Sequence, residues 1–532
     1  MDGPRRSSAQ RLLAMTFAPA ETFRVFGSGG GGYVTYRVAA VVVGALAQVV
    51  LCTEYAAAIE MTAGGRPLYL TGWAMIRQGI RVESSTPDDR TLEQLWVNGR
   101  YAPTAGISLN ATVNAQNGGP TTKRTKAGVY SYREVFQSVS PSVTFEEATV
   151  EISHDSLELR AGLQKFAWGK LDRIQPVDVL NTERFADPFL LEEDERKIGV
   201  PGVLVSHSVS GLERLAEDAR LTLVWIPQYF PYLFPRPGER WYPPAARPPA
   251  TFPVPPLMQS IPVGFHVVNA PAPSFQLANS GYAARASAFS GGVDYAAYYY
   301  HGFDNRPAFR LTAEASGQPS PVPPFVRDVA ATTKLYPVFR NIDLWGADAA
   351  MTWDRFTFRI EAAFVSGRPF ARDIRFLLSD PTQLSPEIAR VLQEISQGIS
   401  PVSVALPPSF AVRSAFEWGL GVDYGWEDTL LLLQVNQTDV LHNDVDLLIR
   451  DVDTVLSANL RRSFWRDDLT VQLLALQGIE SGYTLLMPRV TWRFWERFEA
   501  RVGYLFIAGR EQSLVGQFKD NDEAFVWLRY LL

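Results

Sequence analysis

The chain has 532 residues, a formal net charge of −6, 46% hydrophobic residues and 12% aromatic residues. Its mean hydropathy is only −0.05, which argues against a helical membrane protein, because such proteins contain apolar runs of ~20 residues. The negative charge gives no reason to expect nucleic-acid binding. The single cysteine, Cys52, excludes a disulfide scaffold and cysteine-based metal or nucleophile chemistry in the region that follows it.

The N-terminal region has the pattern of an export signal. Its longest apolar run, Val38–Leu51, is too short for a helical span. Arg37 precedes this run, and the small residues Ala56–Ala58 follow it as at a signal-peptide cleavage site. We therefore predict that 1–58 is an N-terminal extension with a signal peptide and that 59–532 is the mature domain.

The mature region has the alternation of a series of β-strands. Val412–Tyr424 alternates large apolar residues with small or charged ones, and its length suits a tilted membrane strand. The predicted strands are 68–83, 91–101, 105–116, 142–153, 156–166, 202–210, 219–227, 280–290, 292–303, 340–353, 355–366, 411–425, 428–438, 451–463, 468–478, 483–494, 498–508 and 522–532. The fold class is therefore all-β, a single transmembrane antiparallel barrel with 18 strands as the best estimate and a range of about 14–18.

The predicted connections alternate between short and long. Short links lie near 102–104, 154–155, 211–218, 291, 354, 426–427, 464–467 and 495–497. The other links include every long one: 84–90, 117–141, 167–201, 228–279, 304–339, 367–410, 439–450, 479–482 and 509–521. Outer-membrane barrels place short turns in the periplasm and long loops outside, so the pattern predicts both the fold and its orientation.

Aromatic residues and the last strand support the same orientation. Trp353, Trp426, Trp465 and Trp495 fall at the short turns, where rings prefer the membrane–water interface. The last strand has one apolar row, Ala524, Val526, Leu528, Tyr530 and Leu532. We expect this row to face outer-membrane lipid, and Tyr530 and Leu532 to be recognised by the barrel-assembly machinery.

Residues 160–181 contain a motif that resembles a known family. Arg160 begins a strand end that leads to Trp168-Gly169, and Pro176 and Asp178 follow. This segment resembles a family of proteobacterial outer-membrane barrels of unknown function, which carry Gly-Arg-Gln, then Trp-Gly, then Asn-Pro-x-Asp. Gln175 stands where the family has Asn. The resemblance spans about 66–532 and implies a porin-like or transport-associated barrel with no recognised catalytic residues.

Charged residues in the strands are predicted to face the lumen, because Arg or Lys facing lipid at mid-depth costs about 2–4 kcal/mol. The candidate channel-lining residues are Glu147, Glu151, Glu158, Arg160, Arg359, Glu361, Arg413, Glu417, Asp423, Arg489, Arg493, Glu499 and Arg501. They either form salt bridges that stiffen the wall or place an arginine-lined side opposite an acidic side across a constriction. Loop 167–201 is the candidate constriction, although it could also be a solvated surface loop.

Two other long loops have distinct compositions. Loop 228–279 is rich in proline, which restricts the chain to extended forms, so this loop caps the pore, meets a partner or moves freely outside. In loop 367–410, residues 385–398 have the apolar spacing of a short helix. Five histidines are present, but none stands beside a nucleophile on the same face of a strand, so the sequence predicts no catalytic residue, metal site or cofactor.

These observations lead to two functional hypotheses. The first is a channel in the cell outer membrane, reached after export to the periplasm, that passes or assists the passage of small solutes of unknown identity. The second is a plugged barrel that acts as a receptor or partner-binding surface through loops 228–279 and 367–410. The two hypotheses differ in conductance, because an open channel conducts ions and a plugged barrel does not.

Overall fold

The computed structural model describes residues 59–82, 90–119, 133–137, 141–211, 216–379, 381–382 and 384–532. The predicted extension and signal peptide over 1–58 lie outside these residues.

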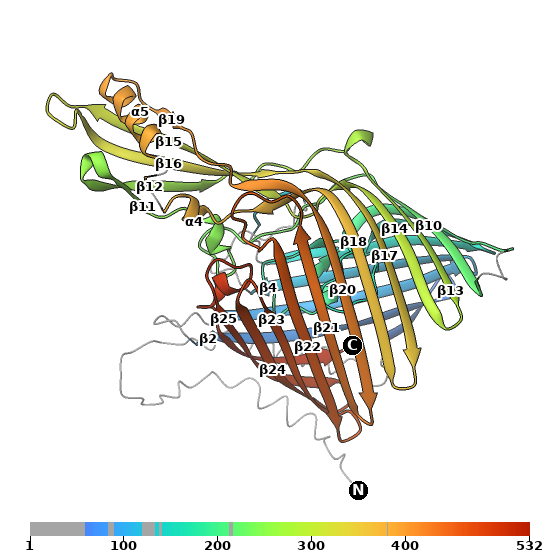
Figure 1. The fold of residues 1–532 in the computed structure, drawn as a ribbon. Helices are drawn as coiled ribbons and strands as arrows, with labels where there is room; N and C mark the ends of the chain where they lie inside the picture. The colour runs from blue at the N-terminus through green and yellow to red at the C-terminus, as the bar shows by residue number, and fades with distance from the viewer. Residues whose placement is uncertain are drawn as a thin grey trace, which may run out of the picture. The chain divides into compact units, whose positions relative to one another are not determined.

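The main sheet closes into a barrel (Figure 1). It has 19 strands, of which β1 (Ile59–Ala63) pairs only with β2, so 18 strands form the wall. The wall strands are β2 (Arg66–Arg81), β3 (Arg90–Thr104), β4 (Ile107–Gly118), β5 (Ser142–His154), β6 (Leu157–Gln164), β9 (Val200–Ser208), β10 (Asp218–Ile226), β13 (Gly281–Ser290), β14 (Val293–Phe303), β17 (Asn341–Trp353), β18 (Phe356–Ala371), β20 (Phe410–Trp426), β21 (Thr429–Val440), β22 (Val452–Phe464), β23 (Leu469–Gly478), β24 (Tyr483–Phe494), β25 (Phe498–Gly509) and β26 (Glu523–Leu531).

Closure is made by the first and last wall strands. β26 pairs antiparallel with β2, from Trp73 opposite Leu531 to Arg81 opposite Glu523. No edge strand is therefore left unpaired in the wall, which removes the site at which sheets aggregate. Each predicted strand overlaps one wall strand. The predicted fold class and strand count are confirmed.

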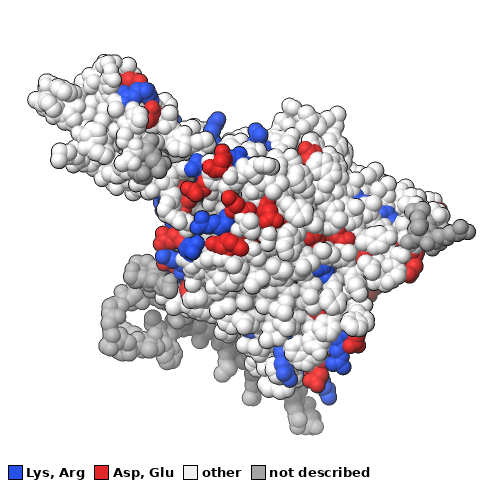
Figure 2. Space-filling view, in the orientation of Figure 1, with Lys and Arg blue, Asp and Glu red and all other residues white. Residues whose placement is uncertain are grey.

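The alternation of residues explains the two faces of the wall. In β20, Phe416 and Leu420 of one row are 40% and 44% exposed, whereas Ala415 of the alternate row is fully buried. The same outward apolar row recurs around the barrel, with Val143, Leu223, Trp345, Ile360, Leu433, Leu460, Leu473, Val490 and Val526 among its members. Figure 2 shows a broad band of the wall with few charged side chains between charges that gather above and below it. Such a belt matches what lipid tails require of a barrel's outer face.

Tight turns join the wall strands at one end. Gly291 and Gly292, between the paired residues Ser290 and Val293, have φ values of 58° and 80°. Positive φ at both central residues is what a two-residue hairpin turn of the favoured twist requires, and glycine adopts it without strain. Because neighbouring wall strands are antiparallel, the long connections share the opposite end. The predicted grouping of connections by length is confirmed.

The aromatic residues predicted at the short turns lie there. Trp353 ends β17, Trp426 ends β20, and Trp465 and Trp495 follow β22 and β24. All but Trp426 are largely exposed. In β26, Val526 points outward whereas Trp527 is buried in the lumen, and Tyr530 packs against Phe498 with ring centroids 5.0 Å apart.

Three of the predicted long loops build a second sheet. Its strands are β11 (Thr251–Val254), β12 (Gln259–Val267), β15 (Ala308–Pro319), β16 (Val326–Val338) and β19 (Val402–Val404), in the order β11-β12-β16-β15-β19. The prediction that 228–279, 304–339 and 367–410 are loops is wrong for these strands.

The sequence does not reveal the second sheet, for two physical reasons. Pro253, Pro262 and Pro337 lie within its strands, and proline weakens a strand prediction because it cannot donate a ladder hydrogen bond. In addition, β12 pairs with β16 in parallel. Parallel strands are not joined by a hairpin turn, so no turn motif in the sequence indicates this pairing.

Two helices contribute side chains to the core of the second sheet, and the longer one lies along it (Figure 1). They are α4 (Ile374–Leu377) and α5 (Ser385–Ser396), so the helix predicted at 385–398 is confirmed. Ile395 of α5 and Leu335 of β16 are fully buried in the core they share. Among the described residues, no helix has both the length and the apolar character needed to cross a membrane.

The remaining elements are short. α3 (Glu193–Arg196), β7 (Thr182–Glu183) and β8 (Lys197–Ile198) lie in the connection between β6 and β9. The 3₁₀ turns are η1 (Pro244–Ala246), η2 (Pro255–Leu257), η3 (Leu277–Asn279) and η4 (Gly516–Phe518).

Candidate functional site

The connection between β6 and β9, residues 165–199, folds into the barrel, and we call it the inner loop. β6 and β9 are neighbours in the wall, and their pairing begins where the inner loop leaves and returns, at Gln164 opposite Val200. The loop therefore spans no gap in the wall. Its position is given by its contacts with wall strands far from β6 and β9.

The first half of the inner loop binds wall strands β14 to β21. Lys170 Nζ lies 3.0 Å from Asp294 Oδ1 and 2.7 Å from Asp348 Oδ1. The backbone N–H of Leu171 donates to Glu361 Oε1 over 2.6 Å. The side chain of Gln434 accepts from the N–H of Asp172 and donates to the carbonyl of Ile174, both over 2.9 Å.

The second half of the inner loop binds the wall strands on either side of the closure. Oε1 of Glu192, which precedes α3, accepts from Arg489 Nη1 over 2.8 Å and from Arg501 Nη1 over 2.6 Å. Glu195 pairs with Arg529 of β26 over 3.4 Å. Asp187 pairs with Arg77 of β2. The inner loop thus contacts wall strands on several sides and crosses the lumen.

Apolar and aromatic contacts add to the charge pairs. The ring of Trp168 lies 5.1 Å from that of Tyr298, in a buried cluster with Val177 and Leu180. Further along, the ring of Phe189 lies 5.2 Å from that of Trp241. The inner loop is therefore a packed part of the molecule. The interpretation of 167–201 as a solvated surface loop is wrong.

A small cavity lined by both charged and apolar residues remains between the inner loop and the wall. It holds about 280 Å³ of space, part of it open to solvent. Its lining includes Asp172 and Arg173 of the loop, Arg359 and Asp423 of the wall, and Gln434, Ser457, Asn459 and Leu474. Arg359 and Asp423, on neighbouring strands, form an ion pair. Guanidinium, carboxylate, amide and hydroxyl groups together can replace the water around a small polar solute.

The inner loop places charged groups in unequal environments. Burial lowers the pKa of Arg173 to about 10, and repulsion from Arg196 and Arg489 adds to this. Burial would raise the pKa of Glu192, but Arg489 and Arg501 outweigh it and lower that pKa to about 2. Near neutral pH, Glu192 is therefore a carboxylate that holds the loop to the arginine-bearing wall.

Asp178 titrates differently within the same loop. Burial raises its pKa to about 6, against the opposing attraction of Lys197, whose Nζ lies 2.8 Å from Asp178 Oδ2. Asp178 Oδ1 also accepts from Asn181 Nδ2 over 3.0 Å. One group of the inner loop therefore changes charge in a mildly acidic range in which Glu192 does not.

The predicted lumen charges fall into small groups. Arg160 Nε lies 2.7 Å from Glu151 Oε1, and its Nη2 lies 3.2 Å from Glu158 Oε1. Arg493 pairs with Glu499 over 2.9 Å. The wall brings these residues together on neighbouring strands or neighbouring positions, so each ion pair is local.

Other predicted residues meet partners outside the predicted set. Glu147 accepts from the N–H of Lys165 over 3.1 Å, and Glu361, Arg489 and Arg501 bind the inner loop as described. Arg413 pairs with Asp444 in the connection after β21, and Glu417 pairs with Arg368. The acidic partners of Arg489, Arg501 and Arg529 thus lie on the inner loop, not on an acidic side of the wall.

Several lumen charges were not predicted. Glu146 is fully buried and binds Arg184 of the inner loop over 3.0 Å. A bulge shifts the register between Thr112 and Val113, so that Glu146 and Glu147 both face inward although they are consecutive. Two consecutive glutamates in a membrane strand are the sequence feature that indicates this bulge. Arg77 and Arg368 were also missed. Arg77 lies in the row of Trp73 and Met75, and Arg368 lies beyond the predicted strand end at 366, after a register shift that follows Val365.

The described residues offer few groups for catalysis. Within these ranges, no three His, Cys, Asp or Glu side chains are placed to hold a metal ion. Ser156 Oγ, in the exposed turn before β6, lies 3.3 Å from His207 Nδ1 of β9. His301 Nδ1 lies 2.8 Å from Asp343 Oδ1 on the outward row of the wall.

Comparison with known proteins gives structural matches alone. No protein-family model matches the chain, and no curated protein matches its sequence. Among solved structures, OccAB1 of Acinetobacter baumannii is 8% identical, with 87% of this chain and 96% of that chain covered and a TM-score of 0.45. OccK8 (OprE) of Pseudomonas aeruginosa is 9% identical, with 87% and 97% covered and a TM-score of 0.43.

A third match has the same character. OmpF of Salmonella typhi, solved in complex with daunomycin, is 9% identical, with 89% of this chain and 100% of that chain covered and a TM-score of 0.38. Similarity at this level carries no functional argument.

Proposed function

We propose that the protein is a channel of the cell outer membrane that passes small solutes, and that the inner loop and the lumen charges select them. The observation that carries the proposal is the charge-bearing cavity beside the inner loop, within a closed wall whose outer face is apolar. Asp172 and Arg173 stand on one side of the cavity, and the pair Arg359–Asp423 stands on the other.

The charges of the cavity suit passage better than tight binding. Because Arg359 and Asp423 neutralise each other, a passing ion meets a strong local field without a large net charge. A solute that enters exchanges part of its hydration for polar groups on both sides. It also leaves readily, since conduction requires sites that bind weakly.

Electrical recording in planar bilayers tests the proposal. The folded wild-type barrel should give discrete conductance steps. Arg359→Gln leaves Asp423 unpaired and should shift the reversal potential toward cation selectivity. Arg355→Gln removes the same charge from an exposed turn of the same hairpin and should not. A folded barrel without conductance steps would overturn the proposal.

A second candidate function is a plugged receptor, and the contacts of the inner loop favour it. The loop is held on several sides of the wall, and segments 228–279 and 367–410 contribute ordered strands to the second sheet. Deleting 251–267 removes β11 and β12 but spares Arg240, which pairs with Glu523 over 3.0 Å. A receptor should lose its partner on this deletion, whereas a channel should keep its conductance.

The membrane setting belongs to the same proposal. The apolar outward row supports contact with outer-membrane lipid. The outward row of β26, with Tyr530 packed on Phe498, supports recognition of Tyr530 and Leu532 by the barrel-assembly machinery after export to the periplasm. Residues 1–58 would supply the signal for that export.

A further inference from the structure

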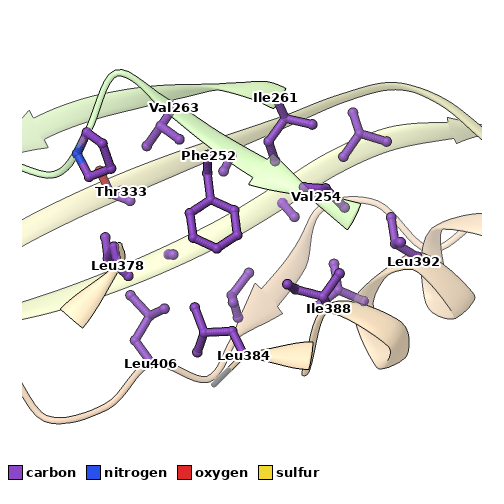
Figure 3. Close-up of a pocket in the computed structure, with 17 residues that line it drawn as sticks. Phe252, Val254, Ile261, Val263, Thr333, Leu378, Leu384, Ile388, Leu392 and Leu406 are labelled. Carbon is purple, nitrogen blue, oxygen red and sulfur yellow. The ribbon is translucent and has the colours of Figure 1, made fainter. Parts of the chain in front are cut away.

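A groove lies between the second sheet and its covering helices (Figure 3). It holds about 690 Å³ of space, part of it open to solvent. Seventeen residues line it, from β11, β12, β15 and β16 on one side and from Leu378, α5 with the preceding Leu384, and the segment from Val404 to Leu406 on the other. The groove belongs to the connections between wall strands and lies apart from the cavity beside the inner loop.

The lining of the groove offers no hydrogen bond to an occupant. Its one polar side chain is Thr333, whose hydroxyl donates to the carbonyl of Gly264 over 2.8 Å. A buried water needs two to four polar partners, so water gains little by ordering here. An occupant of this groove must therefore be hydrocarbon.

Small residues on the sheet create the space. Ala315 stands opposite Ala331 on β15 and β16, and Ala313 stands opposite Thr333. One step further along the same face, Leu311 stands opposite Leu335, and both are buried in the core. The same two strands thus pack solidly where leucines face the interior and leave an open groove where alanines do.

The dimensions of the groove favour an extended occupant. Along the helical side its lining runs from Leu384 to Leu392, eight residues or about 12 Å of helix. On β16 it runs from Val329 to Thr333, about 13 Å of strand. A long narrow space suits a linear chain better than a compact ring. It is also shorter than half of the ~30 Å hydrocarbon core that membrane lipid tails fill.

We propose that this groove binds the linear alkyl chain of a medium-length amphiphile, whose polar head remains at the side open to solvent. Apolar side chains on both faces of the groove contact the tail, and the alanines of β15 and β16 accommodate its width. The inference does not depend on whether the lumen conducts.

Photolabelling of the full chain in lipid nanodiscs tests this proposal. The probe is decanoate that carries a diazirine near the end of its chain. Peptides of α5 and of β11–β12 should be labelled, and unlabelled decanoate should remove that labelling in a saturable manner. Butyrate, six methylenes shorter, should compete at least about 100-fold less well, since each buried methylene strengthens binding roughly 4-fold.

Labelling of lipid-facing wall strands provides an internal control for folding. Those adducts should be insensitive to decanoate in every sample. If groove peptides remain unlabelled while wall strands are labelled, or if decanoate fails to compete, the proposal is wrong. Adducts on the wall strands alone would mean that the probe binds only as a membrane lipid does.

A pair of matched variants locates the site. Ala331→Leu fills the floor of the groove and should reduce labelling of α5 at least about 10-fold. Ala330→Leu adds the same volume to the opposite face of β16 and should leave it unchanged. Equal labelling in the two variants would contradict the proposal. If Ala331→Leu disturbs the second sheet, competition by unlabelled decanoate on the wild-type protein still tests the proposal.

Discussion

The inner loop and the second sheet are both made from connections between wall strands at the same end of the barrel, yet different forces hold them. The inner loop is held to the wall by ion pairs and hydrogen bonds, as at Glu192 and Lys170, together with apolar contacts around Trp168. The second sheet is held by an apolar core around Leu335 and Ile395. The lumen face of the wall presents both charged and apolar side chains, so it can hold the inner loop through both, whereas the second sheet and its helix bury mainly apolar side chains.

The largest expected effect is on the apolar core of the second sheet. Ile395→Ala removes a fully buried side chain that packs near Gly317 and should destabilise this sheet by about 2–4 kcal/mol. Hydrogen exchange should rise in β15 and β16 and remain slow in the wall strands. Ile399→Ala is the matched control, since Ile399 is 49% exposed and should cost little. Equal exchange in the two variants would mean that burial does not hold this sheet.

The next effect is a pH dependence of the inner loop. Burial raises the pKa of Asp178 to about 6 from 3.8, so the folded loop binds this proton more tightly than the unfolded chain does. The stability that this proton contributes is complete below about pH 4 and is lost as the pH rises through 6, by at most about 3 kcal/mol. Proteolysis of the loop should therefore increase between pH 4 and 7. Asp178→Asn should flatten this profile, and an unchanged profile would contradict the assignment.

A smaller effect is expected at the contact between Glu192 and the wall. Glu192→Gln weakens two charge-assisted hydrogen bonds, to Arg489 and Arg501, and should cost about 1 kcal/mol because Glu192 is partly exposed. Exchange of the inner loop should rise, and conductance should rise if the loop limits the channel. In the wild type this contact should weaken only as the pH falls from 4.5 toward 2.

Glu193→Gln is the control for that change. Glu193 pairs with Lys197 inside the loop and not with the wall. It should therefore alter loop exchange less than Glu192→Gln does. A larger effect at Glu193 would mean that internal contacts, not the wall, hold the loop.

The smallest effect is expected for a surface charge on the second sheet. Lys334 Nζ lies 3.4 Å from Glu314 Oε2, and both side chains are exposed. Lys334→Met should change stability by less than about 0.5 kcal/mol, since exposed ion pairs contribute little. Thermal unfolding monitored by exchange in β16 measures it. A loss as large as that from Ile395→Ala would show that charge also holds the second sheet.

The sequence determined the wall because a strand's pattern is local. Alternation in Val412–Tyr424 already separates Phe416 and Leu420 from Glu417 and Asp423, and the spacing of turns orders the strands. The helix at 385–398 was likewise visible from its own periodicity. Glu146 was missed because a bulge shifts the alternation by one residue, and the bulge depends on the pairing with β4.

Alternation and the spacing of turns predicted a barrel of about 18 strands with charges inside and apolar residues outside, because each residue's face follows from its neighbours two positions away. Only the tertiary structure decided what those charges meet. Arg501 and Glu192 are far apart in sequence, and their contact depends on where a long connection folds. The second sheet likewise depends on the parallel pairing of β12 with β16, two segments whose own sequences do not specify each other.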